Sequence, residues 1–305
     1  MSSASPRPKT FIHLTPSNAD AILAFSELAA AVQDIENNKD LVHAAKSLLR
    51  DRKSHQAIAK EIEILKSLPI HPQILRFREV HYERQDQWFS RPADERDERH
   101  NFEARPEKVV IIFSPFARQT MFEFFDETDK DTRLAAFQEL LQGVLALHNT
   151  GFIHRDIKSA NWGVVTIPPA KITTVILDYG LSIRATSCPR GRVGTVPFMA
   201  PEMEVADYGS GVDIWSCGII GLQLFVTEKK LSWSNVTDEN GKRSYINCIK
   251  QLRAEAADTM SNLIFKMLAW DPSKRITAEE ALRHPCFAAV QFEPEPQPGQ
   301  KRRAS

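Results

Sequence analysis

The chain has 305 residues, and 42% of them are hydrophobic, so it is long enough to bury one large core or two smaller ones. Its 39 basic residues equal its 39 acidic residues, which leaves no overall field to attract nucleic acid or an anionic membrane. The composition therefore excludes a general polyanion binder, and we expect partners to be recognised locally, with neither nucleic acid nor membrane among them.

The cysteines and the apolar runs indicate a reducing compartment. Four cysteines lie far apart, without the paired spacing of a zinc site or of a secreted disulfide framework: Cys188, Cys217, Cys248 and Cys286. The first residues contain no apolar signal core, and the longest apolar run, near residues 219–226, is about half of a membrane span. We expect an intracellular protein, cytoplasmic or nuclear, with disordered tails at residues 1–9 and 291–305.

The first half of the chain is predicted to mix helix and strand. Apolar residues on one helical face predict a helix over residues 56–68, which Pro69 ends. A strand is expected at residues 74–80, and the β-branched run at 109–113 predicts a buried strand. The charged stretch between them, residues 83–107, is typical of a solvated loop.

The second half is predicted to be mostly helical. An apolar stripe that begins at residue 132 predicts a helix, which the turn signal at residues 149–151 stops. Residues 164–177 are expected to form a hairpin that turns at Pro168-Pro169. A segment that is apolar nearly all round predicts a buried helix over residues 213–226, and further helices are expected over 260–270 and 278–283.

Polar motifs follow one another in a fixed order along the second half. The first is the run His154-Arg155-Asp156-x-Lys158-x-x-Asn161, and Asp178-Tyr179-Gly180 begins seventeen residues after its asparagine. These runs supply a base and two hard oxygen ligands for magnesium in the order that phosphoryl transfer requires. Three more motifs come later: Gly194-Thr195-x-x-Phe198-Met199-Ala200-Pro201-Glu202, Asp213-x-Trp215-Ser216-x-Gly218, and Arg275.

Together the five motifs resemble the signature of the eukaryotic serine/threonine protein kinase family. The match is good over roughly residues 130–290 and poor over residues 10–120. The resemblance implies an α+β, two-lobed protein-kinase-like fold. Its small, degenerate, β-rich N-lobe would span residues 10–117 with the charged insertion 83–107, and its mostly helical C-lobe would span 118–290.

The family's activity is transfer of the γ-phosphate of ATP to protein hydroxyls, with Mg²⁺ as the ion. By resemblance, Asp156 is the catalytic base that accepts the proton of the substrate hydroxyl, and Lys158 contacts the transferring phosphoryl group. Asn161 and Asp178 would hold the magnesium ion. Lys158 together with Thr195 follows the serine/threonine pattern, so the acceptor is expected to be an aliphatic hydroxyl of a protein substrate.

Other motif residues are expected to support the site. His154 would orient the loop, and Asp213 would accept backbone amides of that loop from the buried helix. Glu202 and Arg275 resemble a buried ion pair that closes the segment after Asp178. Tyr179 replaces the family's usual phenylalanine, and its hydroxyl needs a partner if the ring is buried.

Two features suggest regulation. In relatives with an arginine at the position of Arg155, a phosphate on the following segment pairs with it, and Thr186 and Ser187 are available there. The charged insertion 83–107 is a possible contact for a regulatory partner. Its Trp88 and Phe89 either anchor such a partner or pack locally.

The nucleotide lobe of the family holds the α- and β-phosphates with a lysine that pairs with a glutamate on a helix. Lys46 and Glu61 are the candidates for these catalytic and ATP-binding roles. Glu61 lies beside the apolar stripe of its helix, whereas Glu63 points elsewhere. Apolar residues at 41–49 also fit a helix, in which case Lys46 is a solvated surface lysine.

The adenine ring is expected beside the strand that ends at Phe113, with backbone groups of Ser114 and Phe116 as contacts, because Pro115 has no amide to donate. The phosphate side of this lobe departs from the family. All twelve glycines lie at or beyond Gly143. The positions of a glycine-rich loop are occupied instead by Phe25, Glu27 and Ala30, whose side chains keep the backbone away from phosphate. Alternatively, a helix replaces the hairpin that would carry this loop.

The missing glycines leave an alternative function, a pseudokinase that acts as a protein-interaction scaffold with weak or no nucleotide turnover. Losing one or two charge-assisted backbone contacts costs roughly 1.5 to 3 kcal/mol each, which weakens nucleotide binding without removing the chemical groups. We therefore expect a serine/threonine protein kinase whose activity is reduced. Transfer to a small metabolite is disfavoured by the peptide-positioning segment through Glu202.

Overall fold

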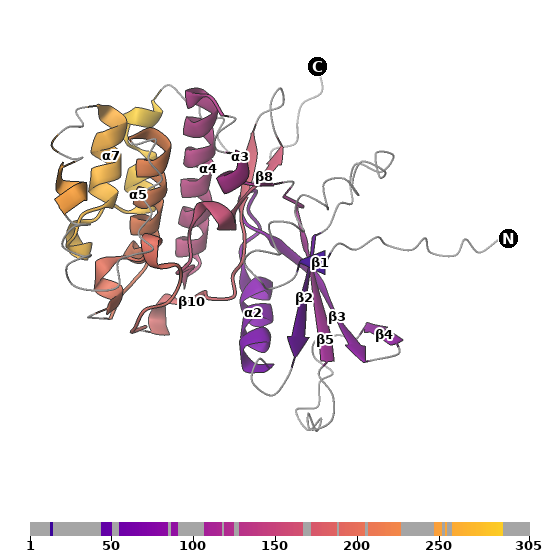
Figure 1. Ribbon diagram of the computed structural model, residues 1–305. Coiled ribbons are helices and arrows are strands. Elements are labelled where there is room, and N and C mark those ends of the chain that lie inside the picture. The colour runs from indigo at the N-terminus through magenta and orange to yellow at the C-terminus, as the bar shows by residue number, and fades with distance from the viewer. Residues whose placement is uncertain are drawn as a thin grey trace, which may run out of the picture.

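The computed structural model describes most of the chain between residues 44 and 288. The described residues are 13–14, 44–50, 55–84, 87–90, 107–117, 119–124, 128–166, 172–187, 189–204, 207–226, 247–251, 254 and 258–288. They form a smaller part built on a β-sheet and a larger, mainly helical part, which stand side by side in Figure 1. The α+β class predicted from the sequence is confirmed.

Five strands form the sheet of the smaller part, in the order β1-β2-β5-β3-β4. Their bounds are β1 His13–Leu14, β2 Ala44–Arg50, β3 Arg76–Arg84, β4 Gln87–Ser90 and β5 Glu107–Ser114. β5 is the central strand, and its Val109 and Ile111 are fully buried, as the β-branched run predicts. β1 pairs with β2 in parallel, whereas all other pairs in this sheet are antiparallel.

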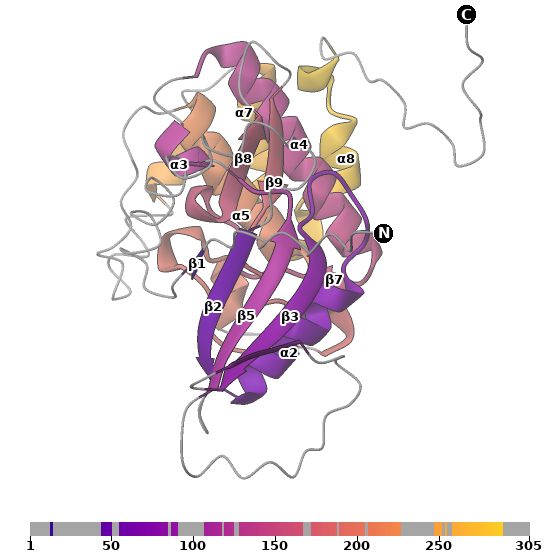
Figure 2. The ribbon, with the colours of Figure 1, turned by 90° about the vertical axis from the view of Figure 1, so that its right-hand side faces the viewer.

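Helix α2 (His55–Ser67) packs on the sheet of the smaller part, as the side view shows (Figure 2). Ile58, Ile62 and Leu65 recur at the spacing of one helical face and are at most 6% exposed. Glu61 lies beside this stripe and is also buried, whereas Glu63 is exposed. The apolar stripe therefore decides which of the two glutamates faces inward.

The larger part is organised around α5 (Gly211–Phe225), which is buried almost all round. α4 (Lys130–Asn149) and α7 (Thr259–Met267) pack against it, and α8 (Ala278–Leu282) packs on α4. None of the described helices combines the length and the apolar character needed to span a bilayer.

Short elements complete the larger part. Its strands form two small sheets, in the orders β6-β8-β9 and β10-β7. The bounds are β6 Gln119–Thr120, α3 Met121–Phe124, β7 Phe152–Ile153, β8 Trp162–Thr166, β9 Thr173–Ile176 and β10 Ile183–Arg184. Single turns of 3-10 helix are η3 Ser159–Asn161, η4 Ala185–Ser187, η5 Val196–Phe198, η6 Pro201–Glu204, η7 Pro272–Lys274 and η8 Pro285–Phe287. β8 and β9 pair antiparallel, as expected for the two sides of the hairpin at residues 164–177, whereas its predicted turn at Pro168-Pro169 lies outside the described residues.

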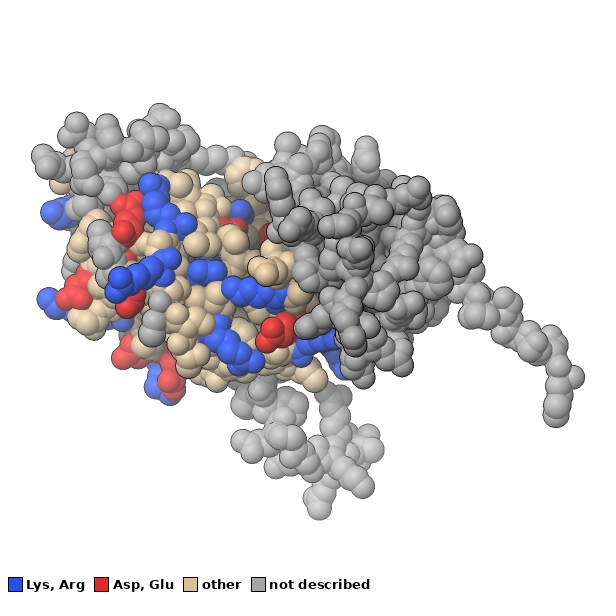
Figure 3. Space-filling model, turned by 90° about the horizontal axis from the view of Figure 1, so that it is seen from below, with Lys and Arg blue, Asp and Glu red and all other residues tan. Residues whose placement is uncertain are grey.

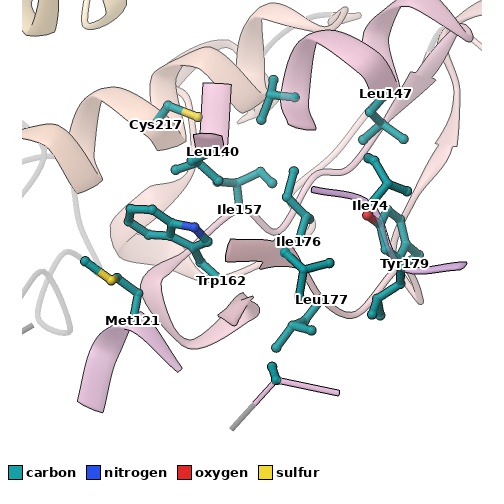
Figure 4. Packing of buried hydrophobic residues seen from close by; sticks show 14 of the residues in the cluster. Ile74, Met121, Leu140, Leu147, Ile157, Trp162, Ile176, Leu177, Tyr179 and Cys217 are labelled. Atoms are coloured by element: carbon teal, nitrogen blue, oxygen red, sulfur yellow. The ribbon is translucent and has the colours of Figure 1, made fainter. Parts of the chain in front are cut away.

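The two parts meet where the chain leaves α2. The Ile176 N–H donates to Gln73 O at 2.9 Å, and Ile74 bridges to Ile176 in parallel. A Cβ on Gly143 of α4 would come within 2.9 Å of Ile176 and 3.1 Å of Gln73 O, so the helix can approach this junction because it has glycine there. Figure 4 shows Ile74 and Ile176 among the buried side chains. One continuous core thus joins the smaller part to the larger.

The prediction of a solvated loop is wrong for residues 83–84, 87–90 and 107, which lie in strands. β3 continues to Arg84, and β4 pairs with it, so that Trp88 lies opposite Glu83 and Phe89 opposite Tyr82. Aromatic residues favour strands, and an edge strand tolerates charged neighbours because one side remains in water. The rest of the predicted loop, residues 85–86 and 91–106, lies outside the described residues.

Two smaller expectations also fail. The helix expected over residues 260–270 ends at Met267, because Asp271 and Pro272 begin a separate turn. The strand expected from residue 74 begins at Arg76, although Ile74 forms an isolated bridge. The region of the expected glycine slots, residues 25–30, lies outside the described residues.

Tyr179 is fully buried at the centre of the junction (Figure 4). Its ring packs edge-on against His154, with the centroids 5.0 Å apart. Its hydroxyl lies near the backbone of Leu75 but makes no hydrogen bond of good geometry with the described residues. Burial raises the pKa of Tyr179, so the hydroxyl remains neutral.

This geometry predicts that Tyr179→Phe leaves the fold intact and raises its stability. Removing a buried hydroxyl without a satisfying partner relieves about 1 kcal/mol, because the ring and its packing are unchanged. Differential scanning calorimetry should show a melting temperature equal to or above that of the wild type. A clear fall in the melting temperature would mean that the hydroxyl forms a real hydrogen bond to the Leu75 backbone.

Candidate active site

Three charged side chains meet between the two parts. The Lys46 ammonium lies 2.6 Å from Glu61 Oε1 and 3.0 Å from Asp178 Oδ1. The side chains of Lys46 and Glu61 are 18% and 8% exposed, whereas that of Asp178 is 49% exposed. β2, α2 and the segment after β9 thus converge on one ammonium group, with a carboxylate that remains open to solvent.

The charges in this triad support one another. Burial opposes the charge on Lys46, but Asp178 and Glu61 outweigh it and raise the pKa of Lys46. The protein around Asp178 partly desolvates its carboxylate even though half of the side chain is exposed, but Lys46 outweighs this and lowers the pKa of Asp178. For Glu61 the balance is different, since burial raises its pKa and Lys46 only counters that shift. The triad therefore presents an ammonium ion and an ionised Asp178 carboxylate.

The strand conformation of β2 directs Lys46 inward. Lys46 lies opposite Ile111 of β5, and Ala44 lies opposite Phe113. Side chains alternate across a strand, so this register fixes the face of the sheet on which Lys46 lies. The helical alternative for this segment is wrong over residues 44–50, because all seven residues pair with β5. Local apolar spacing alone did not reveal this long-range pairing.

Asp156 is the centre of a second polar network. Its Oδ2 accepts a hydrogen bond from Asn161 Nδ2 at 2.9 Å and lies 2.9 Å from Lys158 Nζ. Its Oδ1 accepts a hydrogen bond from Thr195 Oγ1 at 2.7 Å. Lys158 Nζ also donates to Thr195 Oγ1 at 2.8 Å. The catalytic loop, residues 154–161, and the segment 178–202 therefore hold this buried carboxylate in one orientation.

The catalytic loop takes its shape from Asp213, at the start of α5. The two carboxylate oxygens of Asp213 accept the backbone N–H groups of His154 and Arg155, each at 2.8 Å. His148 Nε2 lies 2.9 Å from the same carboxylate. Burial opposes the charge on Asp213, but the contacts with His148 and His154 prevail and lower its pKa. The role expected for Asp213 from the resemblance matches these contacts.

His154 links the loop to the strand that leads to Asp178. Its Nε2 lies 3.0 Å from the carbonyl of Leu177, and its Nδ1 lies 3.3 Å from the N–H of Asp156. A carbonyl can only accept and an N–H can only donate, so Nε2 carries the proton and Nδ1 accepts. The buried ring thus orients the loop, in agreement with a supporting rather than a chemical role.

Asp178 and Gly180 have backbone requirements of their own. Asp178 has a φ of 57°, in the left-handed region that aspartate tolerates better than most residues. A Cβ on Gly180 would lie 3.3 Å from Asp178 Oδ1 and 3.4 Å from Glu61 Oε2. A side chain at this position would crowd the two carboxylates that share Lys46, so glycine keeps the triad compact.

The oxygen atoms near the site suit a magnesium ion that also binds phosphate. Asn161 uses its amide nitrogen for both of its hydrogen bonds to Asp156, which leaves the amide oxygen for another partner. Asp178 offers a half-exposed carboxylate. Among the described residues, no group of three or more His, Cys, Asp or Glu side chains could hold a metal alone. Magnesium commonly takes one or two protein ligands and completes its shell with substrate phosphates and water.

The expected adenine edge follows β5. Phe113 and Phe116 are buried, at 6% and 5% exposure. The Ser114 hydroxyl accepts a hydrogen bond from Arg78 Nε at 2.7 Å, so the side chain of Ser114 is engaged on the sheet. A Cβ on Gly163 of β8 would come within 2.5 Å of Ala117, so β8 lies directly beneath this connection between the two parts.

Glu202 and Arg275 form the buried ion pair that the motifs suggest. Arg275 donates from both terminal nitrogens to Glu202, at 2.5 and 3.0 Å. It also donates to the carbonyls of Gly211 and Ala269, and its guanidinium lies 5.2 Å from the Trp215 ring. All of these partners are fixed in the larger part, so the end of the segment is anchored beside α5.

Sequence reasoning missed two residues of this network, His148 and Tyr208. His148 binds Asp213, and its position in the last turn of the helix before His154 is a signal that could have suggested such a contact. Tyr208 accepts a hydrogen bond from Arg155 Nη1 at 3.2 Å. Nothing in the spacing of Tyr208 along the chain indicates this contact.

Comparison with known proteins identifies the same pattern over most of the chain. The family described as protein kinase domain matches residues 26–287. The calcium/calmodulin-dependent protein kinase type II alpha chain of Drosophila melanogaster is 35% identical over 179 residues, which are 53% of this chain and 31% of that protein. The chain thus spans about a third of the length of this curated relative. The resemblance drawn from the five motifs is confirmed.

A solved structure supports the fold. The crystal structure of the yeast RNA Pol II CTD kinase CTDK-1 complex contains a chain that matches with a TM-score of 0.63 at 22% identity. The match covers 86% of this chain and 89% of that chain. The likeness therefore includes the sheet of the smaller part as well as the helical part.

Gly194 and Gly191 provide a matched test of the contact between the catalytic loop and the segment. Both have a left-handed φ, +101° and +91°, so an alanine at either position costs about 1 to 2 kcal/mol in backbone strain. A Cβ on Gly194 would also lie closer than 3.0 Å to the carbonyl of Arg155, whereas nothing lies within 4 Å of one on Gly191. Gly194→Ala should therefore lower the melting temperature clearly more than Gly191→Ala does in calorimetry. Equal losses would show that the segment does not rest on Arg155.

Proposed function

Because the chain belongs to the protein kinase domain family, we propose that it transfers the γ-phosphate of ATP to serine and threonine hydroxyls of proteins. The observation that carries this proposal is the Asp156 carboxylate, which Asn161, Lys158 and Thr195 hold in one orientation. A triad that contains a second carboxylate, Asp178, stands at the junction with the nucleotide lobe. This arrangement supplies both a base and a place for charged phosphates.

Asp156 acts as the base in this proposal. It takes up the proton of the acceptor hydroxyl, which needs a positioned carboxylate because an aliphatic hydroxyl is a weak nucleophile. Lys158 lies 2.9 Å from Oδ2 of Asp156 and would contact the transferring phosphoryl group. Thr195 forms hydrogen bonds with both side chains and so joins the segment 178–202 to Asp156. These contacts support an acceptor on a protein, presented along the segment.

Mg²⁺ and ATP would supply the phosphoryl group and the neutralising charge when bound. Asn161 and Asp178 would hold the ion through oxygen atoms, which is the ligand type that magnesium prefers. Lys46, positioned by Glu61, would contact the α- and β-phosphates. Phe113 would border the adenine ring, and backbone groups of Ser114 and Phe116 would bind its edge.

A scaffold without catalytic function is the less favoured reading. A scaffold would not need the residues proposed to bind phosphate and take up the proton. These residues are nevertheless all in contact, Lys46 with Glu61 and Asp178, and Asp156 with Asn161. The absence of glycines before Gly143 acts on a different property, the closeness of the backbone to the phosphates. We therefore propose an active enzyme with weakened nucleotide affinity.

The proposed regulatory contact at residues 83–107 remains a prediction. β4 is the last strand in the order of its sheet, and an edge strand can accept a further strand from a partner. The similar yeast chain belongs to a kinase complex, which supports a protein partner for this chain.

The role of Asp156 is tested by Asp156→Asn. Phosphate incorporation into a generic protein substrate should fall about 10²- to 10⁴-fold, because the amide cannot take up the proton. Asp131→Asn, an exposed aspartate in the first turn of α4, is the control and should keep full activity. Millimolar Mg²⁺-ATP should still raise the melting temperature of Asp156→Asn, since ligand binding stabilises the folded state. Unchanged incorporation would refute the assignment of Asp156 as the base. Absence of a thermal shift in the wild type would favour a scaffold without nucleotide turnover.

The pairing of Lys46 is tested by two neighbouring glutamates. Glu61→Gln removes the carboxylate 2.6 Å from Lys46, so kcat/KM for ATP should fall about ten- to a hundredfold. Glu63→Gln changes an exposed residue on the same helix and should leave kcat/KM within about twofold. Steady-state kinetics with varied ATP gives both values. Equal effects of the two substitutions would show that Lys46 does not depend on Glu61.

A further inference from the structure

The side chain of Arg155 is held by uncharged oxygen atoms of the chain itself. Arg155 Nε donates to the carbonyl of Leu181 at 2.7 Å, and its Nη1 donates to the Tyr208 hydroxyl at 3.2 Å. Within the described part of the chain, no carboxylate forms an ion pair with this guanidinium. A residue that the sequence suggested as a phosphate partner thus already has two partners in the unmodified chain.

Tyr208 connects Arg155 to the middle of the segment. The residue is only 6% exposed. Its hydroxyl accepts from Arg155 and donates to the carbonyl of Gly191 at 3.4 Å, and its backbone N–H donates to Pro189 O at 3.3 Å. A tyrosine hydroxyl has one proton to donate, and here that proton points to the segment while a lone pair faces the arginine. Tyr208 therefore bridges the catalytic loop and residues 189–191.

Two surface ion pairs also hold this stretch of the segment. Arg190 pairs with Asp207, and Arg192 lies 3.3 Å from Glu204. Seen from below, the described surface carries several Lys and Arg side chains, some of them beside acidic ones (Figure 3). These pairs are exposed to solvent, so each contributes little. The partly buried link through Tyr208 is the contact among them that water and salt screen least.

The hydroxyls available for phosphorylation are attached elsewhere. Thr186 and Ser187 lie in η4 and are exposed. The Ala185 N–H in the same turn donates to the carbonyl of Gly151 at 2.8 Å, which fixes η4 near the end of α4. In the described structure, no hydrogen bond or ion pair joins η4 to Arg155.

We propose that the hydroxyl of Tyr208 positions Arg155 in the way that a segment phosphate does in relatives, so that the segment is ordered and the site is assembled without phosphorylation. The inference rests on the proposed kinase activity. Arg155 precedes Asp156, and its carbonyl lies against Gly194, whose neighbour Thr195 binds the Asp156 carboxylate. Tyr208 is thus a positioning residue that acts on the base through Arg155.

The test uses the full chain after treatment with a broad-specificity protein phosphatase, with intact mass to verify that no phosphate remains. Tyr208→Phe keeps the ring and its packing, so any loss belongs to the hydroxyl. The double variant Thr186→Ala/Ser187→Ala is the control that removes the candidate phosphorylation sites. Two measurements are made on each protein: kcat and KM for ATP with a generic protein substrate, and amide hydrogen exchange of residues 181–194.

The dephosphorylated wild type and the double alanine variant should keep kcat within about twofold of the untreated protein. Tyr208→Phe should lower kcat about tenfold with KM for ATP nearly unchanged, because one hydrogen bond to a charged group is lost away from the nucleotide. Exchange of residues 189–194 should be slow in the wild type and faster in Tyr208→Phe.

Loss of activity on phosphatase treatment, or wild-type behaviour of Tyr208→Phe, would overturn the proposal. Hydrogen exchange separates this inference from the kinase assignment. If no protein transfers phosphate but the segment is protected in the wild type and exposed in Tyr208→Phe, the Tyr208 link stands and the proposed activity fails. If transfer is observed but the segment is equally exposed in both proteins, the kinase assignment stands and the link fails.

Discussion

The site depends first on a buried carboxylate that has to be satisfied. Asp213 is fully buried in α5, and it meets that requirement by accepting two backbone N–H groups of the catalytic loop at 2.8 Å each. Leaving such a charge without partners would cost several kcal/mol, which exceeds the roughly 1 to 2 kcal/mol of strain in the left-handed φ of 69° at Arg155. The strained turn is therefore retained because the carboxylate requires it, and α5 cannot shift to relax it since it is enclosed by the core.

From this anchor, contacts extend in two directions. Toward the smaller part, His154 binds the carbonyl of Leu177 and so places the residue that follows it, Asp178. Toward the segment, the turn at Arg155 presents its carbonyl to Gly194 and aims the next side chain, Asp156, at Thr195. One ionised group in the core thus determines the relative positions of Asp178 and Asp156, the proposed magnesium ligand and the proposed base, which lie on different stretches of the chain.

The sequence predicts the larger part well, because its information is local. The run from His154 to Asn161 and the buried helix around Asp213 can be recognised from spacing, and the structure places them as the spacing suggests. The smaller part is harder, since its strands depend on partners far along the chain. Lys46 on its own fits a helix as well as a strand, and only pairing with β5, some sixty residues later, decides between them. Tyr208 was missed for the same reason, because a side-chain contact between distant loops leaves no periodic signal.

The two parts hold different groups of the site, which explains how the site can be intact although no glycine precedes Gly143. The proposed base, Asp156, and its partners Asn161 and Thr195 belong to the larger part, where their hydrogen bonds to Asp156 form without help from the smaller part. The smaller part contributes Lys46, whose side chain contacts the larger part through Asp178. Interactions that only bind a substrate set its affinity, whereas interactions with the reacting atoms set the rate of the chemical step. Under the proposed function, loss of glycines from a phosphate loop therefore weakens nucleotide affinity and leaves the groups around Asp156 in place, because those groups are held by contacts within the larger part.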